Sequence, residues 1–327
     1  MAAKIVALIL AILGALPHER LTAKHTYNRH VRPILVKHCA ACHSPGGIAP
    51  MSLMSYGDAS PWAAAIRTQV LERKMPPWQP EEGIGEFHGA RYLSAKEIEA
   101  IIDWATGGTP EGDPARLEPV ISSEATWTLG KPDRVLEAPA VAVGADVMEE
   151  TKCFELGGVR PFSAIDFQPG NREMVRRATI TAAPGCANTS APLALWLPGS
   201  SPLVAPNGYT WPAQKLYLGI HYRKSWRHDG KELRDQSRVG IYYADARARM
   251  IQSRRIEGTY RAERDIRVIT IYADGPQRVE VGGQPLLQVE TFDAAWNGKY
   301  VLKTPVEVKR GSVISGRAWI ETISSRE

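Results

Sequence analysis

The spacing of apolar residues divides the chain into a helical part and a strand-rich part. Apolar residues recur at helical spacing in three stretches, which predict helices over residues 26–37, from Ser60-Pro61 to residue 72, and from Ser94 to residue 106. Proline suits the first turn of a helix, and Ser94 followed by Glu97 has the spacing of a capping box. The predicted inward positions are Tyr27, Val31, Ile34, Leu35, Trp62, Ile66, Val70, Ile98, Ile101, Ile102 and Trp104.

After residue 132 the pattern changes to short runs of β-branched and aromatic residues separated by Gly, Pro and Asn. Such runs are typical of the strands of antiparallel sandwiches. The predicted strands are residues 152–156, 164–167, 174–182, 193–197, 215–221, 237–243, 265–273, 277–281, 286–292, 299–302 and 313–323. Residues 109–132 are rich in Pro, Gly, Glu and Ser, which is typical of a linker.

These patterns predict a multidomain fold in which a small all-α domain precedes an all-β region. A chain of 327 residues is long enough for two or three domains, each with its own core. The predicted boundaries are 1–24 for an N-terminal targeting segment, 25–115 for the helical domain, 116–132 for the linker, 133–248 for a first β-sandwich and 249–327 for a second.

Composition narrows the classes of function. An apolar share of 44% and a charged share of 23% are those of a soluble globular protein. The net charge of +5 is mild and there is no run of Lys and Arg, so we expect no nucleic-acid binding. The chain also lacks G-x-G-x-x-G, P-loop and G-x-S-x-G motifs.

The N-terminus predicts export from the cytoplasm. Lys4 precedes an apolar run over residues 5–16 that Pro17 ends, and this run is too short to span a bilayer but suits a signal peptide. Residues 21–23 match a cleavage site only loosely, so a retained short membrane anchor is the alternative. Either reading predicts a periplasmic or other extracytoplasmic protein, with membrane association through the N-terminus in the second case.

The strongest chemical signal is the sequence Cys39-Ala40-Ala41-Cys42-His43, which reads C-x-x-C-H. This is the attachment pattern of c-type haem. Two thiols at this spacing can each form a thioether to the porphyrin, and the adjacent imidazole becomes the proximal iron ligand. A redox dithiol or a zinc half-site is the alternative reading. A zinc site needs a second ligand pair, and the other two cysteines lie far away in the sequence.

The sixth iron ligand is expected from the same part of the chain. Met75 is the best candidate, because it lies in a Met-Pro-Pro turn shortly before the last helix. Met51, Met54, His88 and an open position are the alternatives. Ligation by Met and His raises the reduction potential relative to ligation by two His, which suits electron transfer. The order helix, C-x-x-C-H, helix, Met-Pro, helix resembles class I cytochromes c.

Several strand motifs of the β region resemble the copper type II ascorbate-dependent monooxygenases, the family of peptidylglycine α-hydroxylating monooxygenase and dopamine β-hydroxylase. The motifs are CFEL (153–156), AIDFQP (164–169), MVRRATI (174–180), LGIHY (218–222) and SRVGIYY (237–243), followed by FDAAW (292–296) and YVL (300–302). With APMSL (49–53) and RKMPPW (73–78), the whole resembles bacterial proteins in which a haem domain precedes such a region. The resemblance implies two jelly-roll-like sandwiches that each bind one copper.

The residues at the implied copper positions do not suit copper. The family's His-His pair corresponds to Arg176 and Arg177, whose guanidinium groups have no free lone pair. The family's third ligand of the first copper, the His of an H-Y dipeptide, corresponds to His221 and is present. The His-x-His pair of the second copper site corresponds to Ile271 and Ala273. There is no His after residue 228 and no Met after residue 250. We therefore expect no bound copper.

The remaining cysteines, Cys153 and Cys186, lie on or just after predicted strands that are candidate neighbours. In an oxidising compartment they can form a disulfide. Burial as two free thiols is the alternative.

Together these observations predict a non-enzymatic, periplasmic c-type cytochrome with one covalent haem and no catalytic residues. Its expected partner is a redox protein or a membrane-attached electron-transfer complex of the respiratory or photosynthetic kind, with the β region as a docking scaffold. One alternative is a copper monooxygenase that receives electrons from its own haem domain, with copper held at His221 by an unrelated residue such as His228. Another is a ligand-binding sandwich that uses its aromatic residues Trp196, Tyr209, Trp211, Tyr217, Tyr222 and Trp226.

Overall fold

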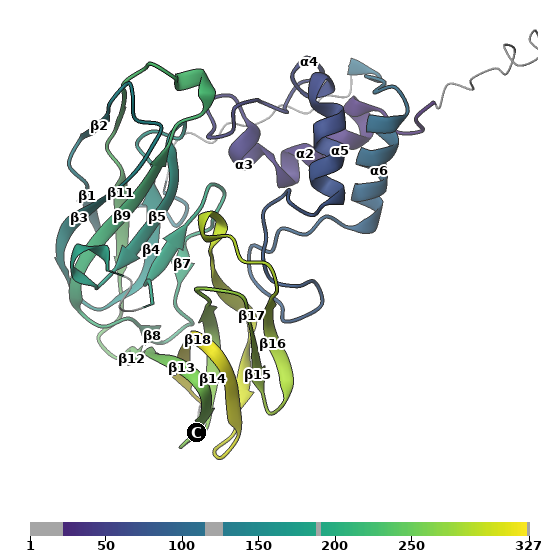
Figure 1. The fold of residues 1–327 in the computed structure, drawn as a ribbon. Helices are drawn as coiled ribbons and strands as arrows, with labels where there is room; N and C mark the ends of the chain where they lie inside the picture. The colour runs from purple at the N-terminus through teal and green to yellow at the C-terminus, as the bar shows by residue number, and fades with distance from the viewer. Residues whose placement is uncertain (1–21, 115–126, 188–190, 326–327) are drawn as a thin grey trace, which may run out of the picture.

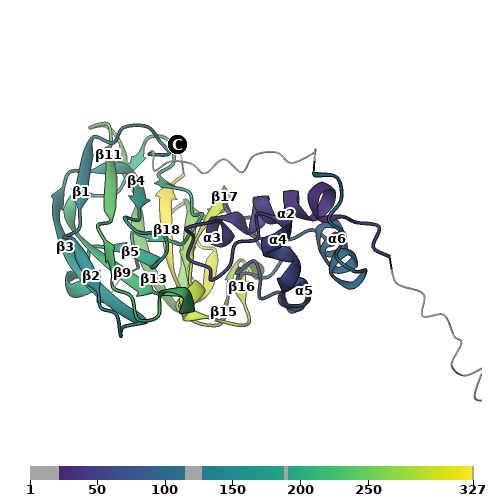
Figure 2. The same ribbon diagram turned by 90° about the horizontal axis from the view of Figure 1, so that it is seen from above.

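The computed structural model describes residues 22–114, 127–187 and 191–325 as a helical region beside two β units (Figure 1). The structure is mostly β, with 39% of residues in strands and several antiparallel sheets. Seen from above, the helices again lie on one side of the molecule and the strands on the other (Figure 2). Residues 1–21 of the predicted targeting segment and most of the predicted linker lie outside the described residues. Within the described ranges, no helix is long and apolar enough to cross a membrane.

The helical region contains the three predicted helical segments, of which the first two include a π or 3₁₀ turn and the third is a regular α-helix. The elements are η1 (Tyr27–Val31), α2 (Arg32–His38), α3 (Ala40–His43), α4 (Tyr56–Ala59), η2 (Ser60–Trp62), α5 (Ala63–Leu71) and α6 (Ala95–Thr106). Pro33 falls at the start of α2, directly after the π-helical turn η1, and has no N–H to donate. The capping box is confirmed: the Ser94 hydroxyl accepts from the Glu97 N–H at 3.3 Å, and the Glu97 carboxylate accepts from the Ser94 N–H at 2.8 Å.

A compact apolar core holds these helices together. Tyr27, Val31, Leu35, Ile101 and Trp104 are almost completely buried in it, as the sequence predicts. Trp62 is wrong as an inward position, because its side chain is 37% exposed. It belongs to the 3₁₀ turn η2, whose three residues per turn shift the face that a helical spacing of 3.6 would bury.

The first β unit is a sandwich of two four-stranded sheets. Their strand orders are β1-β11-β4-β7 and β3-β9-β5-β6. Alternate residues of β9, Leu216, Leu218, Ile220 and Tyr222, point into the core between the sheets, as period-two alternation requires. The strands are β1 (Arg134–Glu137), β2 (Val141–Val143), β3 (Glu149–Val159), β4 (Phe162–Gln168), β5 (Val175–Thr181), β6 (Ala194–Trp196), β7 (Leu203–Val204), β8 (Tyr209–Thr210), β9 (Gln214–Arg223), β10 (Leu233–Asp235) and β11 (Arg238–Tyr243), with short turns η4 (Pro184–Cys186) and η5 (Trp226–His228).

The second β unit differs from the predicted second sandwich, because all its strands except the short β12, which pairs with β8 of the first unit, form one curled, half-barrel sheet. Its longest strand, β18, pairs with β13 along one side and with both β15 and β14 along the other. One strand with three partners curls the sheet around its own core, so no second sheet is needed to cover that face. The elements are β12 (Arg249–Met250), β13 (Gln252–Arg261), β14 (Ile266–Tyr272), β15 (Gln277–Val281), β16 (Gln284–Val289), η6 (Ala294–Trp296), β17 (Lys299–Val308) and β18 (Val313–Ser324).

The helical region is joined to the second β unit by its own chain between α5 and α6. Phe87 forms a β-bridge with Leu302 of β17, and the N–H groups of Glu81 and His88 donate to carbonyl groups of the second unit at 2.8 Å. The Phe87 side chain is 1% exposed and lies in the core of that unit. Residues 78–92 therefore belong to the helical region by sequence but pack with the second β unit.

Candidate functional site

The two thiols and the imidazole of the C-x-x-C-H motif are presented by one short helical turn. Helix α2 ends at His38, Cys39 begins the next turn, and α3 carries Cys42 and His43. The N–H groups of Cys42 and His43 both donate to the Cys39 carbonyl, at 3.1 and 2.9 Å. Cys39 and Cys42 are free thiols, as thioether formation requires. Burial raises the pKa of Cys39 to about 12 and also raises the pKa of Cys42.

A backbone carbonyl fixes the orientation of the His43 ring. Nδ1 lies 3.1 Å from the Met51 carbonyl oxygen, and because a carbonyl only accepts, Nδ1 carries the proton. In the neutral ring, Nε2 then holds the free lone pair. Burial also lowers the pKa of His43, which favours this neutral form. Ring orientation by a carbonyl on the other nitrogen is the usual arrangement of a histidine that ligates a metal.

Met75 lies in the wall of a cavity of about 690 Å³. The same wall contains Leu93, Ile98 and Arg91 of the helical region and Trp296 of the second β unit. Cys39, Cys42 and His43 are not part of this wall, so the structure does not bring Met75 and the motif into one cavity. Arg91 connects the two places, since it lines the cavity and its charge acts on the Cys42 thiol.

The other candidates for the sixth ligand have different surroundings. Met54 is 7% exposed and packs in the helical core, and Met51 is partly buried against that core. His88 lines a second cavity, of about 550 Å³, where the helical region meets both β units. Among the sixth-ligand candidates Met75 alone lines the 690 Å³ cavity in the described part of the chain.

The β units approach the C-x-x-C-H turn closely. Arg91 donates to the Pro198 carbonyl at 2.9 Å. Gly199 faces Ala41 between the two cysteines, and a Cβ added to Gly199 would lie 2.6 Å from the Ala41 Cβ. Gly199 also has a φ of +81°, which favours glycine. The motif is therefore covered on this side by the first β unit.

Two of the positions that the resemblance assigns to a first copper site come together. Arg177 and His221 are direct partners across β5 and β9. Both nitrogens of His221 are engaged, Nδ1 with the Thr151 hydroxyl at 3.1 Å and Nε2 with Glu149 at 3.0 Å. Burial lowers the pKa of His221. Arg177 donates to the Ala294 carbonyl at 2.5 Å.

The positions that the resemblance assigns to a second copper site lie in an apolar core. Ile271 and Ala273 are completely buried in the second β unit. Across residues 22–114, 127–187 and 191–325, no three side chains of His, Cys, Asp or Glu gather as a metal site. His228, the alternative copper partner, lies against Glu173 at 3.7 Å and Ser225 at 3.4 Å.

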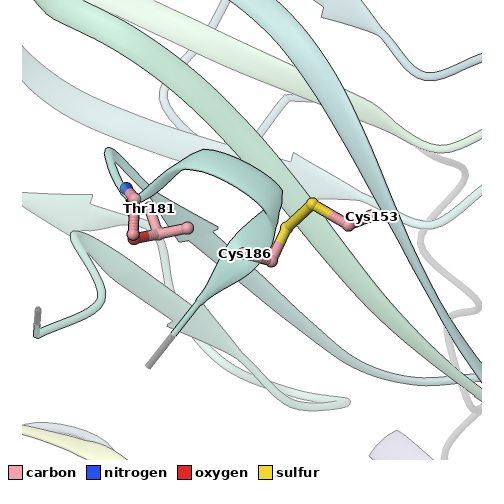
Figure 3. Close-up of a disulfide and its surroundings, with 4 residues drawn as sticks. Cys153, Thr181 and Cys186 are labelled. Carbon is pink, nitrogen blue, oxygen red and sulfur yellow. Dashed lines mark hydrogen bonds between the residues drawn. A yellow bond between two sulfur atoms is a disulfide. The ribbon is translucent and has the colours of Figure 1, made fainter. Parts of the chain in front are cut away.

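Cys153 and Cys186 form a disulfide (Figure 3). The bridge joins β3 to the turn η4 that follows β5, and its Cys186 sulfur lies over Gly219 of β9 between these two strands. It therefore fastens η4 across the outer face of the sheet that carries Arg176, Arg177 and His221.

Most of the aromatic residues proposed for ligand binding are core residues. Tyr209, Trp211 and Tyr222 are at most 3% exposed in the first β unit. Trp226 is 63% exposed on the surface, and Trp196 packs on Phe167 with ring centres 4.9 Å apart. These residues do not form one binding surface.

The residues present fit a covalently held haem, the group that the motif implies. Two free thiols and a histidine with an oriented, unprotonated Nε2 lie on one turn, and this turn carries the fit. The Met75 thioether lines a separate cavity. The sequence analysis missed Arg91, Gly199 and Trp296. Arg91 and Trp296 line the cavity of Met75, and Gly199 packs on the C-x-x-C-H turn. No local pattern marks these three residues.

No known protein family model matches this chain. No curated protein matches it either. Its function is therefore inferred from the residues and geometry described above.

Proposed function

We propose that the chain is an extracytoplasmic c-type cytochrome that transfers single electrons between protein partners. Cys39 and Cys42 would hold one haem by thioether bonds, with His43 as proximal and Met75 as distal iron ligand. The bound haem would supply a one-electron couple between ferric and ferrous iron. We further propose that the β region acts as a scaffold for a redox partner, without copper chemistry.

The observation that carries this proposal is the Met51 carbonyl on His43 Nδ1. It holds the ring in the tautomer whose Nε2 can bind iron, directly beside two free thiols. The other roles that we propose for the chain are structural: one cavity wall holds Met75, and Gly199 lets the first β unit cover the motif.

The lack of a copper role is supported by His221. Its two ring nitrogens already have partners within the sheet, and its strand partner is an arginine. A cation placed there would meet the guanidinium groups of Arg176 and Arg177 instead of two further imidazoles.

The test is expression with a cytochrome c maturation system, followed by denaturation and spectroscopy. We expect haem that stays attached to the unfolded chain, one per molecule by mass spectrometry. The variant Cys39→Ala/Cys42→Ala should lose it, whereas the matched control Cys153→Ala/Cys186→Ala should keep it. Attached haem in the first variant, or none in the unmodified protein, would refute the proposal.

The Met75 assignment has its own spectroscopic test. In the ferrous protein we expect a methionine methyl resonance shifted strongly by the haem ring current. Met75→Leu should abolish it, while Met51→Leu and Met54→Leu should keep it. Loss of the resonance only in one of the two control variants would assign the ligand to that residue instead.

A further inference from the structure

Arg176 occupies an irregular position in β5. The pairing of β5 with β9 shifts between Val175, opposite Tyr222, and Arg177, opposite His221, and Arg176 has no partner across the ladder. A bulge of this kind redirects a side chain out of the regular alternation. The Arg176 side chain is only 8% exposed, so the bulge places a cation inside the molecule.

The buried Arg176 guanidinium lies on an aromatic ring instead of a carboxylate. Its central carbon is 3.3 Å from the centre of the Trp296 ring, which is a cation–π contact. Within residues 22–114, 127–187 and 191–325, no carboxylate lies at ion-pair distance from it. Burial lowers the pKa of Arg176 to about 10. The charges of Arg223 and Arg177 add to this shift, and that of Asp293 opposes it. With a pKa of about 10 the group is positively charged at neutral pH.

This cation lies against the wall of the cavity that Met75 lines, because Trp296, under the guanidinium, is part of that wall. Arg91 of the helical region lines the same cavity and donates to the Pro198 carbonyl, next to Gly199, which packs on Ala41 of the motif. We call Arg91 and Arg176 the interface arginines. In the described part of the chain neither has an ion-pair partner. Uncompensated positive charge from the helical region and from β5 therefore lies at this cavity, close to the segment that packs on the motif.

We propose that the interface arginines, Arg176 above all, raise the reduction potential of the haem by placing positive charge beside its attachment site. This inference rests on the proposed function. On reduction, the ferric iron of a bound haem would accept one electron from the redox partner and become ferrous, so the site would lose one positive charge. Nearby guanidinium groups repel the ferric form more than the ferrous form, and this repulsion is strong where water is excluded. The β region would then set the potential as well as cover the motif.

If Arg176 served only as the link between β5 and Trp296, losing the stack would matter and losing the charge would not, so Arg176→Lys and Arg176→Gln would have similar reduction potentials. Arg176→Lys keeps the charge but not the planar stack, and Arg176→Gln keeps neither. Arg177→Gln is the matched control, because it removes a neighbouring arginine that donates to the Ala294 carbonyl and does not stack on Trp296 of the cavity wall. If Arg176→Gln does not fold, Arg91→Gln tests the same charge from the helical side.

The experiment is a spectroelectrochemical titration of the full-length holoprotein variants, with haem content measured on the same samples. For Arg176→Gln and Arg91→Gln we expect reduction to become about tenfold less favourable, which is a fall of about 59 mV for a one-electron couple. Arg176→Lys and Arg177→Gln should stay close to the unmodified protein. Equal potentials in Arg176→Gln, Arg91→Gln and Arg177→Gln, with haem present, would overturn this inference alone. Absence of haem from the unmodified protein would overturn the proposed function as well.

Discussion

At the scale of single residues, the most deeply buried ion pair of the described residues lies in the second β unit, where both partners also contact the first β unit. Lys299 and Glu321 are 3% and 5% exposed and lie 2.6 Å apart. Lys299 also donates to the Leu193 carbonyl, and the Trp211 indole donates to the same oxygen of Glu321 at 3.2 Å. Burial lowers the pKa of Lys299, and Glu321 opposes this shift. Because both charges are removed from water, each depends on the other.

We predict that Lys299→Met destabilises the protein by about 3–5 kcal/mol, because it leaves the Glu321 carboxylate buried without its cation. The double variant Lys299→Met/Glu321→Gln should recover most of this loss, since it removes both charges and keeps an acceptor for Trp211. The measurement is the free energy of unfolding in denaturant. A double variant as unstable as the sum of the single variants would contradict the interpretation.

A second residue-scale prediction concerns acid. Partial burial raises the pKa of Glu97, but hydrogen bonds from Ser94, Lys37 and His38 outweigh this and lower it from 4.5 to about 2. A pKa lowered by folding means that the unfolded chain binds the proton first. The stability that Glu97 contributes should therefore be complete above pH 4.5 and be lost as the pH falls toward 2.

The variant Glu97→Gln should flatten the stability profile in this acid range. Glu99→Gln, on the same helix but exposed, is the matched control and should keep the profile of the unmodified protein. Unfolding free energies at a series of acid pH values measure the difference. Parallel profiles for Glu97→Gln and the unmodified protein would show that the carboxylate is not the titrating group.

Residues that carry chemistry were predictable only where they are neighbours in the sequence. Cys39, Cys42 and His43 form one contiguous motif whose spacing has a chemical reason. Arg91 and Trp296 come to the site from segments about 50 and 250 residues away, through packing that no local period encodes. The carbonyl of Met51 was equally hidden, because any residue type can supply a carbonyl.

At the scale of elements, the sequence predicts most of the long strands, but it misses the exposed strand β13 and the short strands β1, β2, β7, β8, β10 and β12. All eleven predicted strands overlap observed strands, because alternating apolar residues face a core in each. The ten-residue strand β13 was missed, since Ile256 is its one buried residue and the rest are polar or exposed. Its existence depends on pairing with β18, which is a tertiary interaction.

The loop after β6 provides an element-scale prediction. Gly199→Ala places a methyl group against Ala41 and also strains a residue with positive φ. The matched control Gly208→Ala has a similar φ of +78° but no neighbour within 4 Å. The control should lose about 1–2 kcal/mol from backbone strain alone, and Gly199→Ala should lose more.

Gly199→Ala should also loosen the contact between the first β unit and the C-x-x-C-H turn. Amide hydrogen exchange of residues 39–43 is therefore expected to be faster in Gly199→Ala than in Gly208→Ala. Equal exchange and equal stability in the two variants would mean that the turn does not rest on Gly199.

At the scale of the whole molecule, the helical region and the second β unit share a core. Phe87 is 1% exposed, and its ring lies 5.7 Å from that of Tyr300 and 6.4 Å from that of Trp78. The predicted boundary at residue 115 follows the change of pattern in the sequence. This boundary does not reveal that residues 78–92 pack against the second β unit, because a single buried aromatic residue in a loop leaves no periodic pattern in the sequence.

We predict that Phe87→Ala destabilises the second β unit as well as its junction with the helices, by about 3–5 kcal/mol. Trp62→Ala, an aromatic truncation at a side chain that is 37% exposed, should change stability by no more than about 0.5 kcal/mol. Denaturant unfolding followed by tryptophan fluorescence compares the two. Similar losses in both variants would argue against a shared core.

The decisive measurement is the iron and copper content of the purified, matured protein after incubation with copper and removal of unbound metal. The proposed cytochrome with a copper-free β region predicts one iron per chain and no copper above that of a control protein. One or two copper atoms per chain would contradict the reading of Arg176, Arg177, His221, Ile271 and Ala273. Absence of iron would contradict the assignment of Cys39, Cys42 and His43 as the haem site.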